Sequence, residues 1–449
     1  MPPKRARATK EPEETPKAKR AKPAARSVSA KAAAAVAAAS AAADTPPKGQ
    51  AKTAEAKAKS KPKAEAKRTA AAAKAGDKAP QPAPSKPQTA AERSLSKNAP
   101  LVRSKTPREL EAEASGGKLL RLLTVNVASL RALLAKEDLQ KALRDLLVKE
   151  KPDIFCINEH KLKEEDVEGV EAQLRDVIPK EYVTIHWTCS TAKKGYSGVA
   201  VIMRKGVIED PESVPVLKGM GEGRDADPII SQEGRLLTVE LPELTVVAAY
   251  VPNSGQTLDR LPYRTDRSKK QCWDREFTQY INDLKAKRGK AVIVIGDLNC
   301  CHRVQDIWNM YERPDFPDGL AAKEYTEQYT GLQQLKKCAG LTPEERASFS
   351  TLLQEADLVD TFRAIHPEAQ GVFSYFSTRL VQNRPLNRGL RLDYVLASSS
   401  IAKHLGTARA GESEEQLPLP RVTDSFILDE GSKLADHTPV GCHVLLPAA

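Results

Sequence analysis

Short runs of apolar and β-branched residues recur after about residue 118, and their lengths are typical of strands buried on both faces. The first run covers residues 119–126. Leucines at mixed spacings of three and four follow between Leu130 and Leu147 and predict a helix. Lys151-Pro152-Asp153 ends this helix, and residues 154–157 form the next run. A strand, a helix and a strand in this order predict paired or parallel neighbours in one sheet.

Two later pairs of runs predict β-hairpins. In the first pair, residues 183–187 and 199–203 are separated by a Gly-rich turn at residues 194–198. In the second pair, residues 236–240 and 245–250 are joined by a short connection. Parallel neighbours and hairpins in one chain predict mixed sheets.

The second half of the chain continues the alternation of helices and strands. A helix is expected over Asp274–Lys287, a fully buried strand over residues 291–295, and a further helix after Thr342, where Thr, Pro and Glu mark an N-terminus. Residues 303–340 are expected to form a helical or irregular excursion, and Gly411–Gly431 a surface loop. The pattern predicts an α/β fold in which two mixed β-sheets pack together and are flanked by helices.

Composition divides the chain into two parts. The first hundred residues hold 23 Lys and Arg against 8 Asp and Glu, a local charge of +15, whereas the whole chain carries +11. They contain no aromatic residue and are mostly Ala, Lys, Pro and Ser, so they cannot bury enough apolar surface to offset their ordering entropy. Residues 1–110 are therefore predicted to be a disordered basic tail. Such a tail either holds nucleic acid without sequence preference or serves only solubility and targeting.

Other features of the composition bear on the compartment. The seven cysteines include no CxxC pair, which fits a reduced intracellular protein. The Ala-rich run at residues 32–43 is too short and too weakly apolar to span a bilayer, so no membrane association is expected. Basic clusters at residues 4–7 and 17–22 are typical of nuclear import signals. A mitochondrial transit peptide is the alternative, although Glu11, Glu13 and Glu14 argue against it.

Four polar clusters stand at the ends of the apolar runs and carry the candidate chemistry. They are Asn158–Lys161, Gly296–Asn299, Arg391–Tyr394 and Asp436-His437. Any one of them alone is more typical of a turn, a helix cap or an ion pair, such as one between Arg391 and Asp393. Together they place several carboxylates and a histidine at strand ends, which favours a hydrolytic metal site.

Hydrolysis of a phosphodiester requires an activated water, a stabilised transition state and a neutralised leaving oxygen. His437 can take a proton if Asp393 orients its ring, and Asp297 can serve the water or the leaving group. Glu159 and Asp436 are hard oxygen ligands of the kind that Mg²⁺ prefers. The remaining candidates can hold phosphate oxygens or the water, and they are Asn126, Asn253, Asn299 and Tyr250.

These motifs resemble those of the exonuclease III-type apurinic/apyrimidinic (AP) endonucleases of the endonuclease/exonuclease/phosphatase superfamily. The resemblance covers essentially everything after residue 118. Gly-Asp-Leu-Asn and Asp-His are shared across the superfamily, whereas three motifs are more specific to the abasic-site branch. These are Gly195–Val199 (Gly-Tyr-Ser-Gly-Val), Tyr250–Asn253 (Tyr-Val-Pro-Asn) and Leu341–Arg346 (Leu-Thr-Pro-Glu-Glu-Arg).

The resemblance implies a four-layer α/β sandwich over residues 118–449 that acts in DNA base-excision repair. It implies Mg²⁺-dependent cleavage, with Mn²⁺ as a substitute, of double-stranded DNA on the 5′ side of an abasic site. The products are a 3′-hydroxyl and a 5′-deoxyribose phosphate, and 3′-phosphodiesterase or 3′–5′ exonuclease activity is expected beside this. A monomer in the nucleus, with non-specific DNA held by the basic tail, completes the expectation.

The resemblance also implies roles for individual residues. The catalytic set is His437, Asp297, Asn299, Asp393 and Tyr250. The metal set is Glu159, Asp436, Asn126, Asp297, Asn299 and His437. The substrate-binding set is Asn253, Tyr196, Gly195, Tyr375, Leu390, Leu392 and Arg235.

The chain departs from the family pattern at four positions. Ala128 stands where many relatives have Asp, so altered metal affinity is expected. Leu390 replaces a Trp that walls the abasic pocket, Gln256 replaces an inserting Arg, and Leu123 replaces a redox-active Cys. These changes predict a pocket of different shape, weaker product retention and no redox role.

Two alternatives remain open. Another superfamily hydrolase, such as a phosphoinositide phosphatase or a sphingomyelinase, would share the core motifs but lack Leu-Thr-Pro-Glu-Glu-Arg. A catalytically weak DNA-binding scaffold would fit Ala128 and the basic tail. The segments near residues 303–340 and 405–433 have no counterpart in the family pattern and are interpreted as tolerated surface loops.

Overall fold

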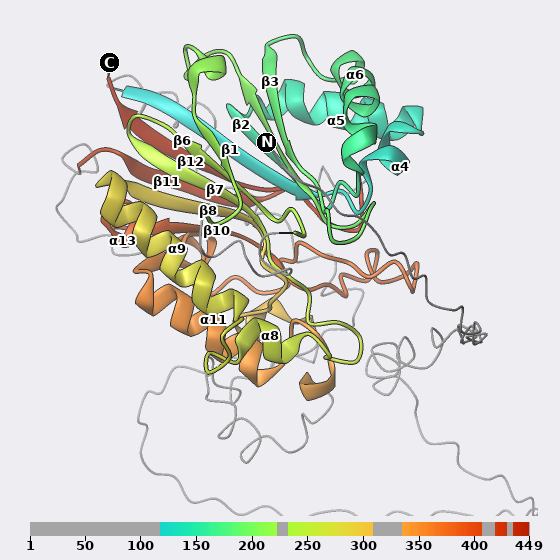
Figure 1. The fold of residues 1–449 in the computed structure, drawn as a ribbon, viewed down its shortest axis with the longest axis vertical. Coiled ribbons are helices and arrows are strands. Elements are labelled where there is room, and N and C mark those ends of the chain that lie inside the picture. The colour runs from blue at the N-terminus through green and yellow to red at the C-terminus, as the bar shows by residue number, and fades with distance from the viewer. Residues whose placement is uncertain (1–116, 222–231, 309–334, 406–417, 429–433, 449) are drawn as a thin grey trace, which may run out of the picture.

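The computed structural model describes residues 117–221, 232–308, 335–405, 418–428 and 434–448. They form two six-stranded sheets packed face to face (Figure 1). The predictions for the basic tail and its import signals lie outside the described residues, as do those for most of residues 303–340. No helix among the described residues is long and apolar enough to cross a membrane.

The first sheet has the strand order β11-β12-β1-β2-β4-β3. Only β1 and β2 run parallel in it, which confirms the predicted strand–helix–strand unit. The β3–β4 pair is antiparallel and confirms the first hairpin. The strands are β1 (Gly117–Asn126), β2 (Ile154–Asn158), β3 (Tyr182–Thr188), β4 (Val199–Arg204), β11 (Arg421–Ile427) and β12 (Val440–Pro447).

The second sheet has the order β5-β6-β7-β8-β10-β9, with β7 and β8 as its parallel pair. The antiparallel β6–β7 pair confirms the second hairpin. The strands are β5 (Val216–Lys218), β6 (Leu236–Glu240), β7 (Leu244–Tyr250), β8 (Ala291–Asp297), β9 (Leu358–Asp360) and β10 (Asp393–Ser398).

Side-chain alternation along the strands builds four layers. Leu122 of β1 and Ile295 of β8 point into one apolar core between the sheets. The opposite face of the first sheet, with Leu123, packs against α4 (Leu130–Leu134), α5 (Glu137–Glu150) and α6 (Val167–Val177). The opposite face of the second sheet, with Val294, packs against α9 (Trp273–Arg288) and α11 (Pro343–Glu355). α5 and α6 therefore lie on one side of the sheets and α9 and α11 on the other (Figure 1). The expected four-layer α/β sandwich is confirmed.

The three helices predicted from the sequence are present with one difference, and the helices over residues 167–177, 261–265, 361–365 and 399–402 had no prediction of their own. The expected single helix after the first strand is two, because the chain leaves helical geometry at Lys136, whose backbone is extended. Thr342 caps α11 with a full capping box to Glu345, as its sequence predicted. The helices are α4 (Leu130–Leu134), α5 (Glu137–Glu150), α6 (Val167–Val177), α8 (Leu261–Thr265), α9 (Trp273–Arg288), α11 (Pro343–Glu355), α12 (Thr361–Ile365) and α13 (Ser399–Ala402).

The prediction of a surface loop over Gly411–Gly431 is wrong for residues 421–427. These residues form β11, which pairs with β12 and is buried along its whole length. The polar residues of this run are accommodated inside. Asp424 accepts a hydrogen bond from the Ser425 amide, and Ser425 accepts one from the Thr361 hydroxyl. Polar groups can be buried when they are hydrogen-bonded. The polar composition of this segment was therefore not sufficient evidence that it is exposed.

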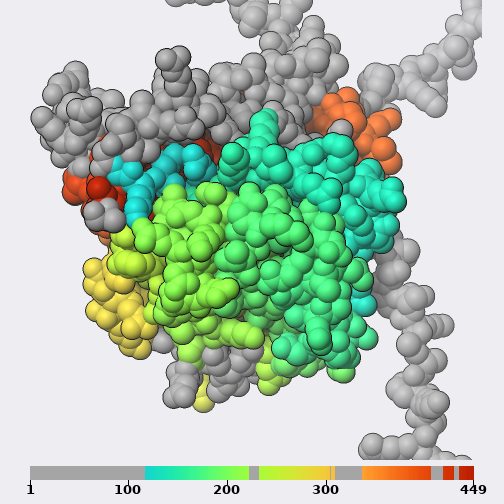
Figure 2. Space-filling model, turned by 90° about the horizontal axis from the view of Figure 1, so that it is seen from above, coloured from blue at the N-terminus to red at the C-terminus, as the bar shows by residue number. Residues whose placement is uncertain are grey.

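Seen from above, residues of the first half of the described chain form one continuous face, coloured teal to green (Figure 2). The polar clusters singled out in the sequence lie instead at one edge of the two sheets.

Candidate active site

The candidate site lies where strands of both sheets end or begin. β2 ends at Asn158 and β8 ends at Asp297, whereas β10 begins at Asp393. Because β10 runs antiparallel to β8, Asp393 stands directly across from Asp297 in the ladder. The loop before β12 brings Asp436 and His437 to the same edge. The clusters converge as predicted, but two of them precede their strands and two follow them.

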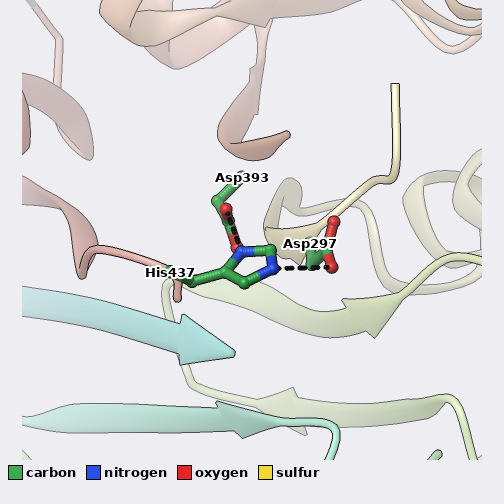
Figure 3. Close-up of side chains that lie close together, drawn as sticks. All are labelled: Asp297, Asp393 and His437. Carbon is green, nitrogen blue, oxygen red and sulfur yellow. Dashed lines mark hydrogen bonds and ion pairs between the residues drawn. The ribbon is translucent and has the colours of Figure 1, made fainter. Parts of the chain in front are cut away.

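His437 stands between two aspartates (Figure 3). Its Nδ1 lies 2.8 Å from Asp393 Oδ2 and its Nε2 lies 4.0 Å from Asp297 Oδ2. Burial alone would lower the pKa of His437, but the charge of Asp393 and the hydrogen bond to it outweigh burial and raise that pKa to about 10. The imidazole is therefore protonated at neutral pH, with Nδ1 donating to Asp393.

Asp297 is a buried carboxylate whose proton affinity is strongly altered. Burial and the nearby charge of Asp393 raise its pKa to about 7, although His437 and Asn126 act in the opposite direction. Its Oδ1 accepts a hydrogen bond of 2.9 Å from the Asn299 amide. A carboxylate with this pKa can exchange a proton near neutral pH, as a general base or acid must.

Asn126 connects the two sheets at this edge. Its Nδ2 donates to Glu159 Oε2 at 3.1 Å and to Asp297 Oδ2 at 3.0 Å. The other oxygen of Glu159 lies 2.9 Å from Lys161 Nζ. Glu159 and Lys161 both have positive φ, which turns the chain sharply as it leaves β2. These contacts place a lysine ammonium and a side-chain amide around the Glu159 carboxylate.

Asn299 and Asn253 form a second amide pair beside Asp297. Asn299 adopts a left-handed backbone with φ of 48°, and its Nδ2 donates to the Val251 carbonyl at 2.9 Å. Its Oδ1 accepts a hydrogen bond of 2.9 Å from Asn253 Nδ2. The side-chain amides predicted to face phosphate or water are thus held in one network around Asp297.

Tyr250, Arg235 and Tyr196 form a stack next to Glu159. Burial, followed by the charge of Glu159, raises the pKa of Tyr250 well above its usual range, so its hydroxyl keeps its proton. The Arg235 guanidinium lies over the Tyr250 ring at 4.8 Å and donates to the Tyr196 hydroxyl at 3.1 Å. Tyr196 and Gly195 are the residues that the family resemblance places on the DNA-binding rim. Arg235 is only 1% exposed, so it lies beneath this rim and supports Tyr196 from inside.

The Gly-rich turn before β4 packs against the segment that carries Glu159. Gly195 is partly exposed with φ of 70°. Gly198 has φ of 94°, and a Cβ there would lie 2.3 Å from the ring of His160. Only glycine allows this approach, and the Lys161 amide donates to the Ser197 carbonyl across the same contact. This part of the Gly-Tyr-Ser-Gly-Val motif therefore has a packing role.

Of the residues predicted to form an abasic pocket, Tyr375 lies beside His437. The ring of Tyr375 is 4.9 Å from that of His437, and Tyr375 exchanges backbone hydrogen bonds with Leu390. Leu392 is largely buried, and its carbonyl accepts from the Leu298 amide. Ser374 Oγ, to which the sequence had assigned no role, accepts hydrogen bonds from the amides of Leu392 and Asp393.

Arg391 does not pair with Asp393. Its guanidinium is fully buried and contacts Asp306 Oδ1 at 2.7 Å and Asp360 Oδ2 at 2.6 Å. Asp306 also pairs with Arg363, and these two arginines hold the pKa of Asp306 well below its usual range despite burial. Asp393 is therefore left to His437.

The residues at this edge fit a hard divalent cation. Glu159, Asp297 and Asp436 supply carboxylate oxygens, and Asn126 bridges the first two. Among the described residues, Asp436 Oδ1 is buried with no hydrogen-bond partner, as a metal-facing oxygen would be. His437 also lies close to Asp297 and Asp393, but its Nδ1 is engaged by Asp393 and its raised pKa disfavours metal ligation. The acidic edge formed by Glu159, Asn126 and Asp297 is the better match.

Comparison with known proteins identifies a matching family and relatives in sequence. A model of the endonuclease/exonuclease/phosphatase family matches residues 123–408. The chain is 32% identical over 307 residues to the DNA repair nuclease APEX1 of Danio rerio, covering 68% of this chain and 81% of that protein. It is 31% identical over 290 residues to an exodeoxyribonuclease of Bacillus subtilis, covering 64% and 92%.

Two solved structures resemble this chain in fold. The crystal structure of the AP endonuclease LMAP from Leishmania major superposes with a TM-score of 0.59 at 27% identity, covering 78% of this chain and 93% of that one. The Xenopus laevis APE2 catalytic domain, at 20% identity and a TM-score of 0.51, shares the fold.

Proposed function

Since this chain belongs to the endonuclease/exonuclease/phosphatase family, we propose that it is a DNA-repair nuclease that hydrolyses the phosphodiester 5′ to an abasic site. The single observation that carries the chemistry is His437 held between Asp393 and Asp297 at the shared edge of two sheets. A proton-bearing imidazole and a carboxylate with a pKa of about 7 form an acid and base pair suited to neutral pH.

In the proposed reaction, Asp297 accepts a proton from water as the water oxygen attacks phosphorus. The bond from phosphorus to the 3′ oxygen of the upstream nucleotide breaks, and this oxygen takes a proton from solvent water, while Asp297 returns to solvent the proton that it accepted. The products are a 3′-hydroxyl and a 5′-deoxyribose phosphate. Asp297 is the better base of the two, because the raised pKa of His437 keeps its imidazole protonated.

The other polar groups stabilise the charge that develops on the phosphate. The His437 imidazolium and the protonated Tyr250 hydroxyl donate hydrogen bonds to phosphate oxygens. Asn253 and Asn299 fix the water and the phosphate through their amides. Asp393 keeps the imidazole charged and oriented.

Mg²⁺, or Mn²⁺ in its place, would be held by Glu159, Asp297 and Asn126 with Asp436 nearby. When bound, the ion would supply Lewis-acid charge at a phosphate oxygen. Ala128 gives this edge one carboxylate fewer than many relatives have, so weaker metal affinity is part of the proposal.

Two groups of residues are proposed to select the substrate, one on the DNA-binding rim and one in the abasic pocket. Tyr196 and Gly195 would contact the DNA backbone, with Arg235 supporting Tyr196 from below. Tyr375, Leu390 and Leu392 would form an apolar pocket that accepts a flipped sugar without a base and excludes an intact nucleotide. Activity on 3′ ends is proposed at the same site.

The basic tail is proposed to hold DNA without sequence preference, since residues 1–100 carry a charge of +15. Its basic clusters are proposed to direct the protein to the nucleus, with the mitochondrion as the alternative. The protein is proposed to act as a monomer.

The test is cleavage of a duplex that carries one tetrahydrofuran abasic analogue, titrated with Mg²⁺ and with EDTA as the control. We expect metal-dependent incision immediately 5′ to the analogue, with the undamaged duplex left intact. Salt-sensitive binding without incision would instead support the DNA-binding scaffold. Incision of undamaged duplex at the same rate would remove abasic-site selection from the proposal.

A further inference from the structure

The turn that follows β8, residues Asp297–Cys301, is held from outside by a buried arginine. Arg264 of α8 is 3% exposed and donates through Nη2 to the Leu298 carbonyl at 2.7 Å and through Nη1 to the Asn299 carbonyl at 2.8 Å. Asn299 has a left-handed backbone with φ of 48°, which Asn adopts more readily than most residues, and this backbone turns the chain sharply after β8. The guanidinium therefore fixes the two carbonyls that set the direction of this turn.

Glu345 of α11 holds Arg264 in place. Its Oε1 accepts from Arg264 Nη1 at 2.9 Å and from the Ser254 hydroxyl at 2.5 Å. Its Oε2 accepts from the Gly340 amide at 2.7 Å and from Thr342 Oγ1 at 2.8 Å. A buried carboxylate with this many donors is fully satisfied and fixed in position.

Through these bonds, Glu345 ties two neighbouring turns to the one after β8. Ser254 follows Asn253, whose side-chain amide bonds Asn299 Oδ1. The Gly340 carbonyl accepts from the Cys301 amide at 2.8 Å. The turn is thus fixed at Leu298, Asn299 and Cys301, immediately after Asp297.

Helix capping explains only part of this arrangement. A capping box requires Glu345 to reach back to the Thr342 backbone, and it does so. Capping does not require the same carboxylate to bind Arg264 and Ser254, which lie 81 and 91 residues away in sequence.

We propose that Arg264 and Glu345 are positioning residues for the reaction, acting through the backbone of Leu298 and Asn299 on the side chains of Asp297 and Asn299. This inference rests on the proposed function, which gives Asp297 and Asn299 their roles. It also assigns a task to Glu345 in the Leu-Thr-Pro-Glu-Glu-Arg motif, whose part in the reaction the sequence left open. The planar fork of arginine can bond two carbonyls and a carboxylate at once, whereas a lysine ammonium cannot reproduce that geometry.

The experiment compares Arg264→Lys and Glu345→Gln with Arg204→Lys in the full chain. Arg204 makes a matched control, because it pairs with the buried Asp153 at the opposite end of the first sheet. Single-turnover incision of the tetrahydrofuran duplex, the Kd for that duplex and the melting temperature are measured for each protein. We expect Arg264→Lys and Glu345→Gln to lower the single-turnover rate by about 10–100-fold while the Kd changes by less than about threefold. Arg204→Lys should keep the wild-type rate.

Two further measurements separate positioning from lost stability. Backbone hydrogen exchange should rise in Arg264→Lys at residues 298–301 and stay unchanged in β8. In an Asn299→Ala background, Arg264→Lys should cost much less than it does alone, because the two act through one turn. Three outcomes would overturn the inference. The rate losses of Asn299→Ala and Arg264→Lys could be additive, or the single-turnover rate of Arg264→Lys could fall only in proportion to the folded fraction. The third outcome is weaker duplex binding at an unchanged single-turnover rate. Absence of incision by the wild-type chain would instead refute the proposed function, and the exchange at residues 298–301 would still decide whether Arg264 fixes the turn.

Discussion

Asp393 faces Asp297 across the antiparallel pair of β10 and β8, and His437 occupies the space between their carboxylates. Two carboxylates brought this close would repel each other. The protonated imidazole relieves that repulsion, and in return the two charges raise the pKa of His437 to about 10. The pair and the histidine therefore titrate as one unit.

This unit predicts a bell-shaped dependence of single-turnover rate on pH. The base Asp297 must be ionised, so the rate should rise as pH increases through about 7 and fall as His437 loses its proton near 10. Raising the Mg²⁺ concentration should move the lower limb to more acidic pH, because a bound cation favours the ionised carboxylate. A rate that decreases between pH 6 and 8 would contradict the assignment of Asp297 as the base.

Asp393→Asn should lower the rate by about 10²–10⁴-fold and move the upper limb of the pH profile downward by several units. The amide keeps the shape of the side chain but removes the charge that holds the imidazole protonated. The profile is measured at saturating duplex, and Asp145→Asn on the exposed side of α5 serves as the control. An unshifted upper limb would mean that another group titrates there.

Asp297→Asn and His437→Ala should each reduce turnover by several orders of magnitude and leave duplex binding nearly unchanged. Both residues are buried among polar groups at the sheet edge, and neither belongs to the predicted DNA-binding rim. Incision rates and Kd values for the tetrahydrofuran duplex check this. Loss of binding in step with activity would place these residues in substrate recognition.

Ala128→Asp should lower the Mg²⁺ concentration for half-maximal incision by about tenfold, since it adds a carboxylate beside Asn126. Ala128 has φ of 54°, which Asp adopts more readily than most residues, and its amide already donates to Asn126 Oδ1 at 2.8 Å. Ala128→Asn is the uncharged control and should change the titration little. Identical metal titrations for both variants would show that this position does not influence the metal.

Gly198→Ala should destabilise the fold by about 1–3 kcal/mol, because the new Cβ meets the His160 ring in a left-handed backbone. Gly169→Ala is the matched control within α6, where nothing lies within 4 Å of the added carbon. It should stabilise the fold by about 0.5–1 kcal/mol. Urea unfolding of both variants measures the difference, and equal midpoints would argue against the packing role of Gly198.

The strand pattern and the polar clusters could be read from the sequence because both depend on local composition. Asp297 follows a continuous apolar run, and such runs predict buried strands directly. The partners of Arg391 could not be predicted, since Asp306 and Asp360 lie 85 and 31 residues away from it. Asp393 lies opposite Asp297 only because β10 runs antiparallel to β8. The residues of β10 do not themselves encode the direction of that strand in the sheet.

The buried edge strand β11 was missed for a related reason. Its Asp424 and Ser425 were interpreted as surface residues, but a local hydrogen bond to Asp424 and a tertiary one from Thr361 to Ser425 make their burial possible. Ser374 and Arg264 likewise act on backbone groups, and a sequence carries no local signal for which carbonyl or amide a side chain will reach.

The candidate site is assembled across the interface between the sheets. Asn126 and Glu159 come from the first sheet and Asp297 and Asp393 from the second, so the Asn126–Asp297 hydrogen bond crosses the interface that the apolar core maintains. Neither sheet alone holds a complete set of groups. The core side chains therefore keep the two halves of the site in register. A shift of one sheet along the other would separate Asp297 from Asn126 and Glu159 while each sheet kept its own strands. Heat should consequently abolish incision as soon as the sheets lose their mutual alignment, before the strands themselves unravel.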